Sequence, residues 1–212
     1  LVVVGDTLLA AEEGGALVAL SATDGRELWK TEIGGRLRVG PSAAGGVVYA
    51  GSSDGDLVAV ETASGEERWR QSLESGVRVR PLVGEERVFV GTASGRIAAL
   101  DSRSGEELWE VSLGALAAPG MALGAGTLVV GTADRRIYGL DPDSGKERWR
   151  FETEGAVRGA PAVTAATAYC GSSDSHLYAL ELESGRLLWK YRLDGPALVP
   201  VVLDQRSVVI TS

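Results

Sequence analysis

Three arginines recur at one position of the sequence and are the first candidates for a binding site. Arg38, Arg78 and Arg158 are separated by multiples of forty residues, and each stands three residues before a proline. A planar guanidinium group binds carboxylates and phosphates through paired hydrogen bonds. If the three gather at one mouth of a central channel, we expect them to bind an anion or an acidic peptide of a protein partner. The alternative is that each arginine pairs with local acidic residues or with water.

Acidic residues recur as well. Aspartates share a turn position at Asp54, Asp134 and Asp174, and glutamates share a strand position at Glu27, Glu67, Glu107 and Glu147. A calcium ion needs about six to eight converging oxygen ligands, and one aspartate in each hairpin does not converge with the others. The pattern therefore predicts turn-forming aspartates and surface glutamates. It indicates neither a calcium site nor paired acid–base catalysis.

His176 and Cys170 are the only histidine and the only cysteine. The repeat position of His176 is filled elsewhere by Ala16, Asp56 and Arg96, so we expect an exposed side chain there. One such histidine cannot assemble a catalytic triad or a metal cluster. Cys170 takes a strand position that is apolar in other repeats and is expected to be a small buried filler. We thus predict no catalytic, cofactor-binding or metal-ligating residue and no cofactor.

The spacing of all these residues follows from a forty-residue repeat that organises the whole chain. Every tryptophan falls at one position of this repeat, and a glycine stands four residues before it. The tryptophans are Trp29, Trp69, Trp109, Trp149 and Trp189, and the glycines are Gly25, Gly65, Gly105, Gly145 and Gly185. A fixed long period indicates that one supersecondary unit is stacked repeatedly. We expect these residues to dock neighbouring units onto one another rather than to bind a ligand.

Each repeat is expected to hold four short antiparallel strands. In the second repeat these are Val39–Ala44, Val47–Gly51, Leu57–Glu61 and Glu66–Leu73. The dipeptides between them, such as Gly45-Gly46 and Asp54-Gly55, are typical of tight hairpin turns. No apolar period of 3.6 residues is long enough for a helix.

Several of the expected strands are apolar on both faces, such as Leu57–Val60 and Val88–Val90. Such strands belong to sheets that are covered on both sides. Four-stranded sheets packed between copies of themselves are the blades of a β-propeller. Small residues at one position, such as Ala19 and Ala59, are expected to leave room for the tryptophan ring of a neighbouring blade.

The chain holds five complete repeats and then two strands of a sixth, near Leu198–Leu203 and Ser207–Thr211. We treat residues 1–212 as a single β-propeller domain. The chain opens on Leu1 rather than methionine, so we expect residues to be missing at both ends of a ring of seven or eight blades. Two alternatives stay open: the half blade pairs with another chain, or five blades close with a trailing hairpin.

Composition limits the classes of partner. The 212 residues are 44% hydrophobic and carry a net charge of −8, with acidic and basic residues interspersed. Without a basic stripe, nucleic acid is not an expected partner. No apolar run approaches the roughly 20 residues of a transmembrane helix, and a single cysteine allows no internal disulfide bond.

The recurring motif A-x-D-x-x-S-G-x-E-x-W, seen at Ala99–Trp109, resembles the repeat of the pyrroloquinoline-quinone-type β-propeller family. The resemblance covers essentially the whole chain and implies that the tryptophans tie neighbouring blades together. One branch of the family contains quinoprotein dehydrogenases that bind the quinone and calcium. Another contains the propeller lipoproteins of the bacterial outer-membrane β-barrel assembly machinery, and a third contains sensor domains.

The chain is most similar to the lipoprotein branch. Many dehydrogenases of the family carry an adjacent pair of cysteines or a haem-binding motif, which the single Cys170 excludes here. The resemblance implies a noncatalytic periplasmic scaffold for protein partners, with or without a lipid anchor in the outer membrane. The alternatives are a fragment of a quinone-dependent dehydrogenase and a ligand-sensing propeller.

Overall fold

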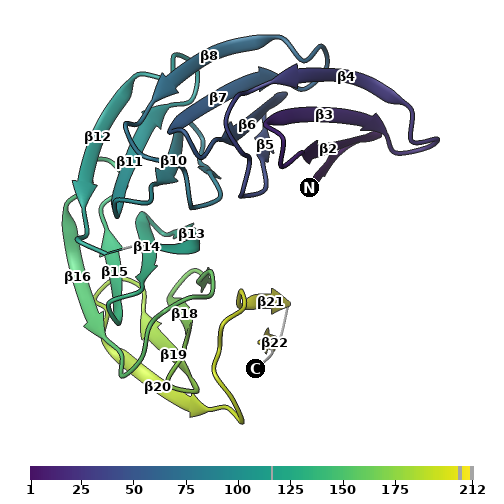
Figure 1. Ribbon diagram of the computed structural model, residues 1–212. Coiled ribbons are helices and arrows are strands. Elements are labelled where there is room, and N and C mark those ends of the chain that lie inside the picture. The colour runs from purple at the N-terminus through teal and green to yellow at the C-terminus, as the bar shows by residue number, and fades with distance from the viewer. Residues whose placement is uncertain (116, 205–206, 211–212) are drawn as a thin grey trace. The chain divides into compact units, whose positions relative to one another are not determined.

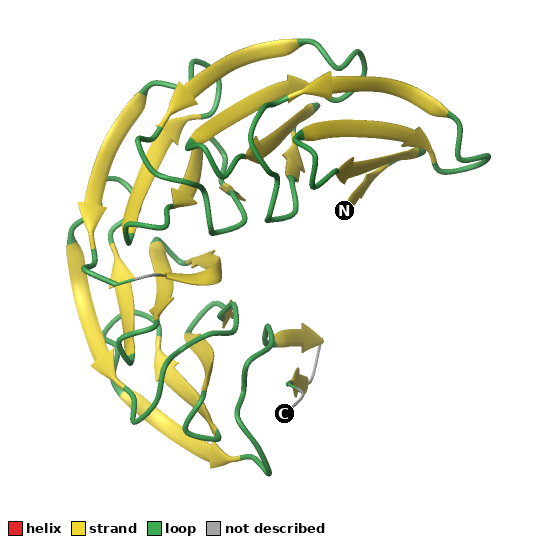
Figure 2. Cartoon of the chain, in the orientation of Figure 1, coloured by secondary structure: helices red, strands yellow, loops and turns green. Residues whose placement is uncertain are grey.

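A computed structural model describes residues 1–115, 117–204 and 207–210 of the chain. In these residues the regular structure is entirely β-strand, without a helix (Figure 2). The chain divides into two compact units, Leu1–Leu108 and Trp109–Ser212. Figure 1 follows the strands from β1 to β22. The fold is a β-propeller whose blades are four-stranded antiparallel sheets.

The first unit contains two complete sheets and most of a third. In each sheet the strands are hydrogen-bonded in chain order. The first sheet consists of β1 (Val2–Val4), β2 (Thr7–Ala11), β3 (Ala16–Ser21) and β4 (Glu27–Glu32). The second consists of β5 (Ser42–Ala44), β6 (Val47–Gly51), β7 (Asp56–Glu61) and β8 (Glu67–Ser72). The third consists of β9 (Leu82–Val83), β10 (Arg87–Gly91), β11 (Arg96–Asp101) and β12 (Glu107–Ser112), and the unit boundary falls inside β12.

The second unit continues the same pattern. Its first sheet consists of β13 (Ala117–Gly124), β14 (Thr127–Thr132), β15 (Arg136–Leu140) and β16 (Glu147–Glu152). The next consists of β17 (Ala162–Val163), β18 (Thr167–Ser172), β19 (His176–Glu181) and β20 (Leu187–Arg192). A two-stranded sheet of β21 (Val202–Asp204) and β22 (Ser207–Val209) follows.

The first strand of a sheet is generally shorter than the sequence indicates. In the second repeat it begins at Ser42 rather than Val39, because Pro41 has no backbone N–H to donate. The strands after Pro81 and Pro161 are limited to two residues each. In the fourth repeat Met121 replaces that proline, and β13 extends over eight residues with a shift of register between Ala117 and Met121.

Glycine residues allow the tight hairpin turns between the strands. Ala44 pairs with Val47 across a two-residue loop in which Gly45 and Gly46 have φ of 58° and 79°. Both residues of this kind of turn need positive φ, which glycine adopts without steric cost.

The central strands are covered on both faces, as the sequence predicts. Every residue of β6 and β14 is buried, and Leu57, Val58 and Val60 of β7 are fully inaccessible. This burial on both sides is the packing expected of sheets stacked face to face.

Candidate functional site

The tryptophan of one sheet contacts a glycine of the next. In the first unit, Nε1 of Trp29 donates a hydrogen bond of 3.0 Å to the carbonyl of Thr62. A β-carbon built on Gly65 would lie 2.7 Å from Cδ2 of Trp29. Gly65 also has a φ of +77°, so this position requires glycine for both space and conformation.

The same geometry recurs three more times. Nε1 of Trp69 donates to Ser102 at 3.1 Å, and the ring lies on Gly105. In the second unit, Trp109 donates to Pro142 at 3.0 Å and lies on Gly145, while Trp149 donates to Leu182 at 2.9 Å and lies on Gly185. Each donor and acceptor are 33 residues apart in sequence.

Two of the expected docking residues lack this contact. A β-carbon on Gly25 would meet nothing within 4 Å. Trp189 is 43% exposed, and no hydrogen bond of its indole nitrogen is found among the described residues. Gly25 and Trp189 belong to the repeat pattern. Gly25 precedes the first of the four tryptophan–glycine contacts in the described residues, and Trp189 follows the last.

The small residues opposite the tryptophans play a different part from the one expected. Ala19 pairs with Trp29 across β3 and β4 of one sheet, and Ala59 pairs with Trp69 in the same way. At the glycine of this position, Gly139, a β-carbon would lie 2.1 Å from Trp149 of its own sheet. The expectation of a ring from the neighbouring blade was wrong here. The space beside each small residue is filled by the tryptophan directly opposite it on the adjacent strand of the same sheet.

The candidate arginines are exposed. Arg38 and Arg78 lie in the first unit, ahead of β5 and β9, and Arg158 lies in the second, ahead of β17. Within the described residues, none of the three forms an ion pair. Their neighbours differ: Arg36 is 3.8 Å from Glu13, and Arg80 donates to the carbonyl of Pro41. The three guanidinium groups are therefore exposed and have no ion-pair partner among the residues that the structure describes.

The turn aspartates act as acceptors that tie loops together. Oδ2 of Asp174 accepts backbone hydrogen bonds from Glu154 and Gly155 at 2.9 and 3.0 Å, and another from the hydroxyl of Tyr178 at 2.8 Å. Burial alone would raise the pKa of Asp174, but the hydrogen bonds from Tyr178, Ser172 and Glu154 hold it below its usual value. Burial and the bond to Asp174 raise the pKa of Tyr178 above its usual range.

His176 is less exposed than the sequence indicates. Its side chain is 19% exposed, its Nδ1 lies 3.3 Å from Oδ1 of Asp174, and its ring stacks at a tilt on Tyr178 with centroids 6.0 Å apart. We expected His176 to be exposed because other repeats have short or charged residues at this position. The imidazole ring of His176 instead packs against Tyr178 of the same strand. Cys170 is fully buried, and this burial raises its thiol pKa to about 12.

A buried serine or threonine recurs beside these turns. These residues were not among the candidates predicted from the sequence. Ser52, Thr92, Thr132 and Ser172 are fully inaccessible. Oγ of Ser52 accepts from the backbone of Asp54 and Asp56, and Oγ of Ser172 donates to the carbonyl of Gly155. A serine or threonine at the same place in four repeats is the signal that could have revealed them. Their bonds are internal, which indicates a structural role.

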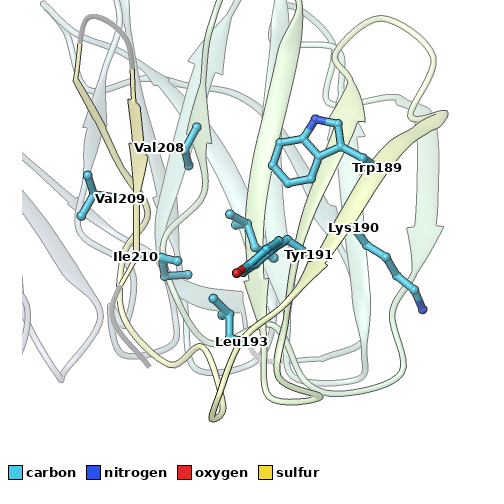
Figure 3. Close-up of a pocket in the computed structure, with 8 residues that line it drawn as sticks. Trp189, Lys190, Tyr191, Leu193, Val208, Val209 and Ile210 are labelled. Carbon is cyan, nitrogen blue, oxygen red and sulfur yellow. The ribbon is translucent and has the colours of Figure 1, made fainter.

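The described residues contain no cluster of three or more His, Cys, Asp or Glu side chains able to hold a metal ion. They also contain no helix long and apolar enough to cross a membrane. The cavities of the described residues include three with volumes of about 730, 220 and 300 Å³. The cavity of about 730 Å³ is mainly apolar and lies between β20 and the final strand (Figure 3).

Comparison with protein families gives one family model, described as "Outer membrane protein assembly factor BamB", which matches residues 13–118 and 93–212. No curated protein sequence matches the chain.

Among solved structures, BamB from Moraxella catarrhalis superposes with a TM-score of 0.82 at 23% identity, covering 97% of this chain and 66% of that one. The computationally designed Ika8 protein superposes with a TM-score of 0.90 at 16% identity, covering 99% of this chain and 66% of that one. The chain thus spans slightly less than two thirds of each structure, and both likenesses concern the fold.

Proposed function

Because this chain belongs to the PQQ-type repeat family whose model is described as outer membrane protein assembly factor BamB, we propose that it is a noncatalytic β-propeller scaffold. Its partners would be proteins of the outer-membrane assembly machinery, and its location the periplasm, with or without a lipid anchor. The observation that carries the proposal is the family match, which extends from residue 13 to residue 212.

The tryptophan–glycine contacts give such a scaffold its rigidity. Each contact joins a buried or half-buried indole to the backbone of the following sheet through one hydrogen bond and one close ring contact. We propose that these contacts dock the blades. The tryptophans and the glycines beneath them are then committed to packing, and binding is left to other residues.

Arg38, Arg78 and Arg158 are proposed as the binding residues. They are exposed, and the structure gives them no ion-pair partner among the described residues, although the chain as a whole is acidic. Acidic side chains or a carboxylate of a partner segment would satisfy these guanidinium groups by charge-assisted hydrogen bonds.

The test is binding of purified outer-membrane assembly components to an immobilised triple variant, Arg38→Ala/Arg78→Ala/Arg158→Ala. We expect the affinity to fall by roughly tenfold or more with an unchanged melting temperature, because the three side chains are exposed. The matched control is Arg26→Ala/Arg103→Ala/Arg186→Ala, which removes the same charge from three exposed turn positions. Equal loss in both variants would show a general charge effect and discard the arginine assignment.

The scaffold proposal has a separate test. Saturable binding of pyrroloquinoline quinone with calcium, together with dye-linked alcohol oxidation, would replace it with the dehydrogenase alternative. We expect neither, since Trp29, Trp69, Trp109 and Trp149 pack on glycines of the next sheet.

A further inference from the structure

A small cavity lies between the second and third sheets, inside the first unit. Its volume is about 220 Å³, and three turns line it: those between β5 and β6, between β9 and β10, and between β11 and β12. Two guanidinium groups belong to its lining, those of Arg68 on β8 and of Arg103 in the last of these turns. Glu85 contributes a carboxylate. We call this space the Arg103 cavity.

Hydrogen bonds hold the backbone around the Arg103 cavity in place. The carbonyl of Ser102 accepts from Nε1 of Trp69 at 3.1 Å and from the hydroxyl of Tyr49 at 3.2 Å, which joins the two sheets. The amide of Ser102 donates to the carbonyl of Glu86 at 2.9 Å. The turn that carries Arg103 is therefore fixed to both sheets before a ligand binds, and a preformed site loses less entropy on binding.

Arg68 keeps hydrogen-bonding capacity that the rest of the protein does not use. Among the described residues its guanidinium group has one hydrogen-bond partner, Glu61, which accepts from Nε at 2.5 Å. An arginine side chain has about five N–H donors, so those on Nη1 and Nη2 remain for a ligand. The side chain of Arg103 is exposed, and no hydrogen bond or ion pair of its guanidinium group is found in the part of the chain that the structure describes.

The second unit contains an equivalent cavity with a different set of charges. Its volume is about 300 Å³, and Arg148 stands there at the repeat position of Arg68. Glu183 stands at the repeat position of Arg103. The lining of this second cavity includes one arginine and two glutamates, Glu181 and Glu183, whereas that of the Arg103 cavity includes two arginines and one glutamate. The balance of charge is thus reversed, which makes the second cavity an internal control.

The donors of Arg148 are already engaged. Its Nε and Nη2 donate to Oδ2 of Asp141 at 3.2 and 2.5 Å, and its Nη1 lies 3.5 Å from Oγ1 of Thr127. In the first unit Val47 takes the position of Thr127, and a valine side chain cannot accept a hydrogen bond from Arg68. Unused donors and an excess of positive charge therefore occur together in the cavity of the first unit and not in its counterpart.

We propose that the Arg103 cavity binds the side chain of an aspartate or glutamate in an extended segment of another protein. Arg68 and Arg103 line the same small space, so one carboxylate can accept charge-assisted hydrogen bonds from both. Glu85 would accept from a backbone N–H group of the same segment. The volume is below the roughly 300–1,000 Å³ of small-molecule and cofactor pockets, and it suits a single side chain. A phosphate dianion fits less well, because its second charge would lie near Glu85.

The experiment titrates the isotope-labelled whole chain with a blocked tripeptide that has glutamate between two glycines, followed by nuclear magnetic resonance. We expect saturable shifts of the backbone amide signals of Gly45, Gly84 and Arg103, which lie in the three turns around the cavity. The same peptide with glutamine in place of glutamate should give no saturable shift, because hydrogen bonds to an uncharged amide are weaker. Equal binding of the two peptides, or no shift with the glutamate peptide, would overturn the proposal.

Two variants place the binding at the cavity. Arg68→Leu introduces the residue that other repeats have at this position, Leu28 and Leu108, and Arg103→Glu reverses the charge in an exposed turn. Each should weaken the affinity for the glutamate peptide by about tenfold or more. Arg148→Leu, the same change in the second unit, is the matched control and should leave the affinity unchanged. Parent-like affinity in both cavity variants would show that the peptide binds elsewhere.

Two further titrations identify the ligand and separate this site from the proposed function, on which the proposal does not depend. Free glutamate or inorganic phosphate that binds more tightly than the blocked peptide would overturn it in favour of a small-anion site. The triple variant Arg38→Ala/Arg78→Ala/Arg158→Ala should bind the glutamate peptide as the parent chain does, because none of the three arginines lines the cavity. Loss of peptide binding in the triple variant would assign the peptide to those arginines instead. The binding of assembly components tests the scaffold proposal separately.

Discussion

Glycine at the docking position meets two separate demands, and the chain provides a natural comparison between them. Gly105 and Gly25 both have positive φ, of 75° and 73°. A β-carbon on Gly105 would lie 2.6 Å from Cδ2 of Trp69, whereas one on Gly25 would meet nothing within 4 Å. Both positions therefore require a residue that tolerates positive φ. Only Gly105 must also lack a side chain to leave room for the tryptophan ring.

We predict that Gly25→Ala lowers the free energy of unfolding by about 1 kcal/mol, the cost of a left-handed residue with a side chain. Gly105→Ala should lower it by roughly 2–4 kcal/mol, because the indole of Trp69 must also move. Urea denaturation followed by far-ultraviolet circular dichroism measures both. Equal losses would mean that the ring contact contributes nothing and that the glycine pattern reflects turn conformation only.

At the scale of the element, the turn between the last two strands of a sheet depends on its aspartate. Oδ1 of Asp141 accepts hydrogen bonds from the backbone of Asp143 and Ser144, and Oδ2 accepts from Arg148. The hydrogen bond from Arg148, followed by those from Ser144, lowers the pKa of Asp141 to about 2. A carboxyl whose pKa is lower in the folded state stabilises the fold above its unfolded pKa of about 3.9, and the contribution disappears as the pH falls through the folded value.

Accordingly, Asp141→Asn should destabilise the protein at pH 7 and make its unfolding free energy less sensitive to pH between about 4 and 2. The readout is a series of urea titrations at several pH values in that window. Asp6→Asn, a change at another exposed aspartate, is the control for the removal of one negative charge. The same pH dependence in Asp141→Asn and the parent would show that the turn does not rely on the carboxylate.

The sequence predicts the strands and turns well because they follow local chemistry. The turns at Gly45-Gly46 and Ser64-Gly65 need positive φ, and glycine at those places shows it without knowledge of the rest of the chain. The start of β5 was misplaced because Pro41 limits it. The partner of each tryptophan was also assigned incompletely: cross-strand pairing places Ala59 against Trp69 of the same sheet, and only three-dimensional register reveals this.

The candidate binding residues were harder to predict than the fold. Periodicity identifies Arg38, Arg78 and Arg158 as a set, but their exposure, and the absence of ion pairs with other described residues, come from the structure. The exposure of Trp189 has no sequence signature of its own, because Trp189 stands in the same motif as Trp29 to Trp149. Its 43% exposure, against 7% for Trp149, is seen only in the structure.

For the molecule as a whole, stability in a stack of repeats is approximately the sum of each unit and its interfaces with its neighbours. Trp149 is 7% exposed and donates a hydrogen bond to Leu182, while Trp189 is 43% exposed and packs only on its own sheet within the described residues. Trp149→Ala should therefore cost about 3–5 kcal/mol of unfolding free energy, and Trp189→Ala about 1 kcal/mol.

Chemical denaturation of both variants measures the two costs. If docking onto the next sheet supplies most of the stabilisation by an indole, Trp149→Ala should lower the unfolding free energy much more than Trp189→Ala does. An equally large cost for Trp189→Ala would place the stabilisation inside each sheet, in the contact with Ala179 and Tyr169, and the interfaces would then be secondary. The two costs thus measure how far this propeller is held together between its blades rather than within them.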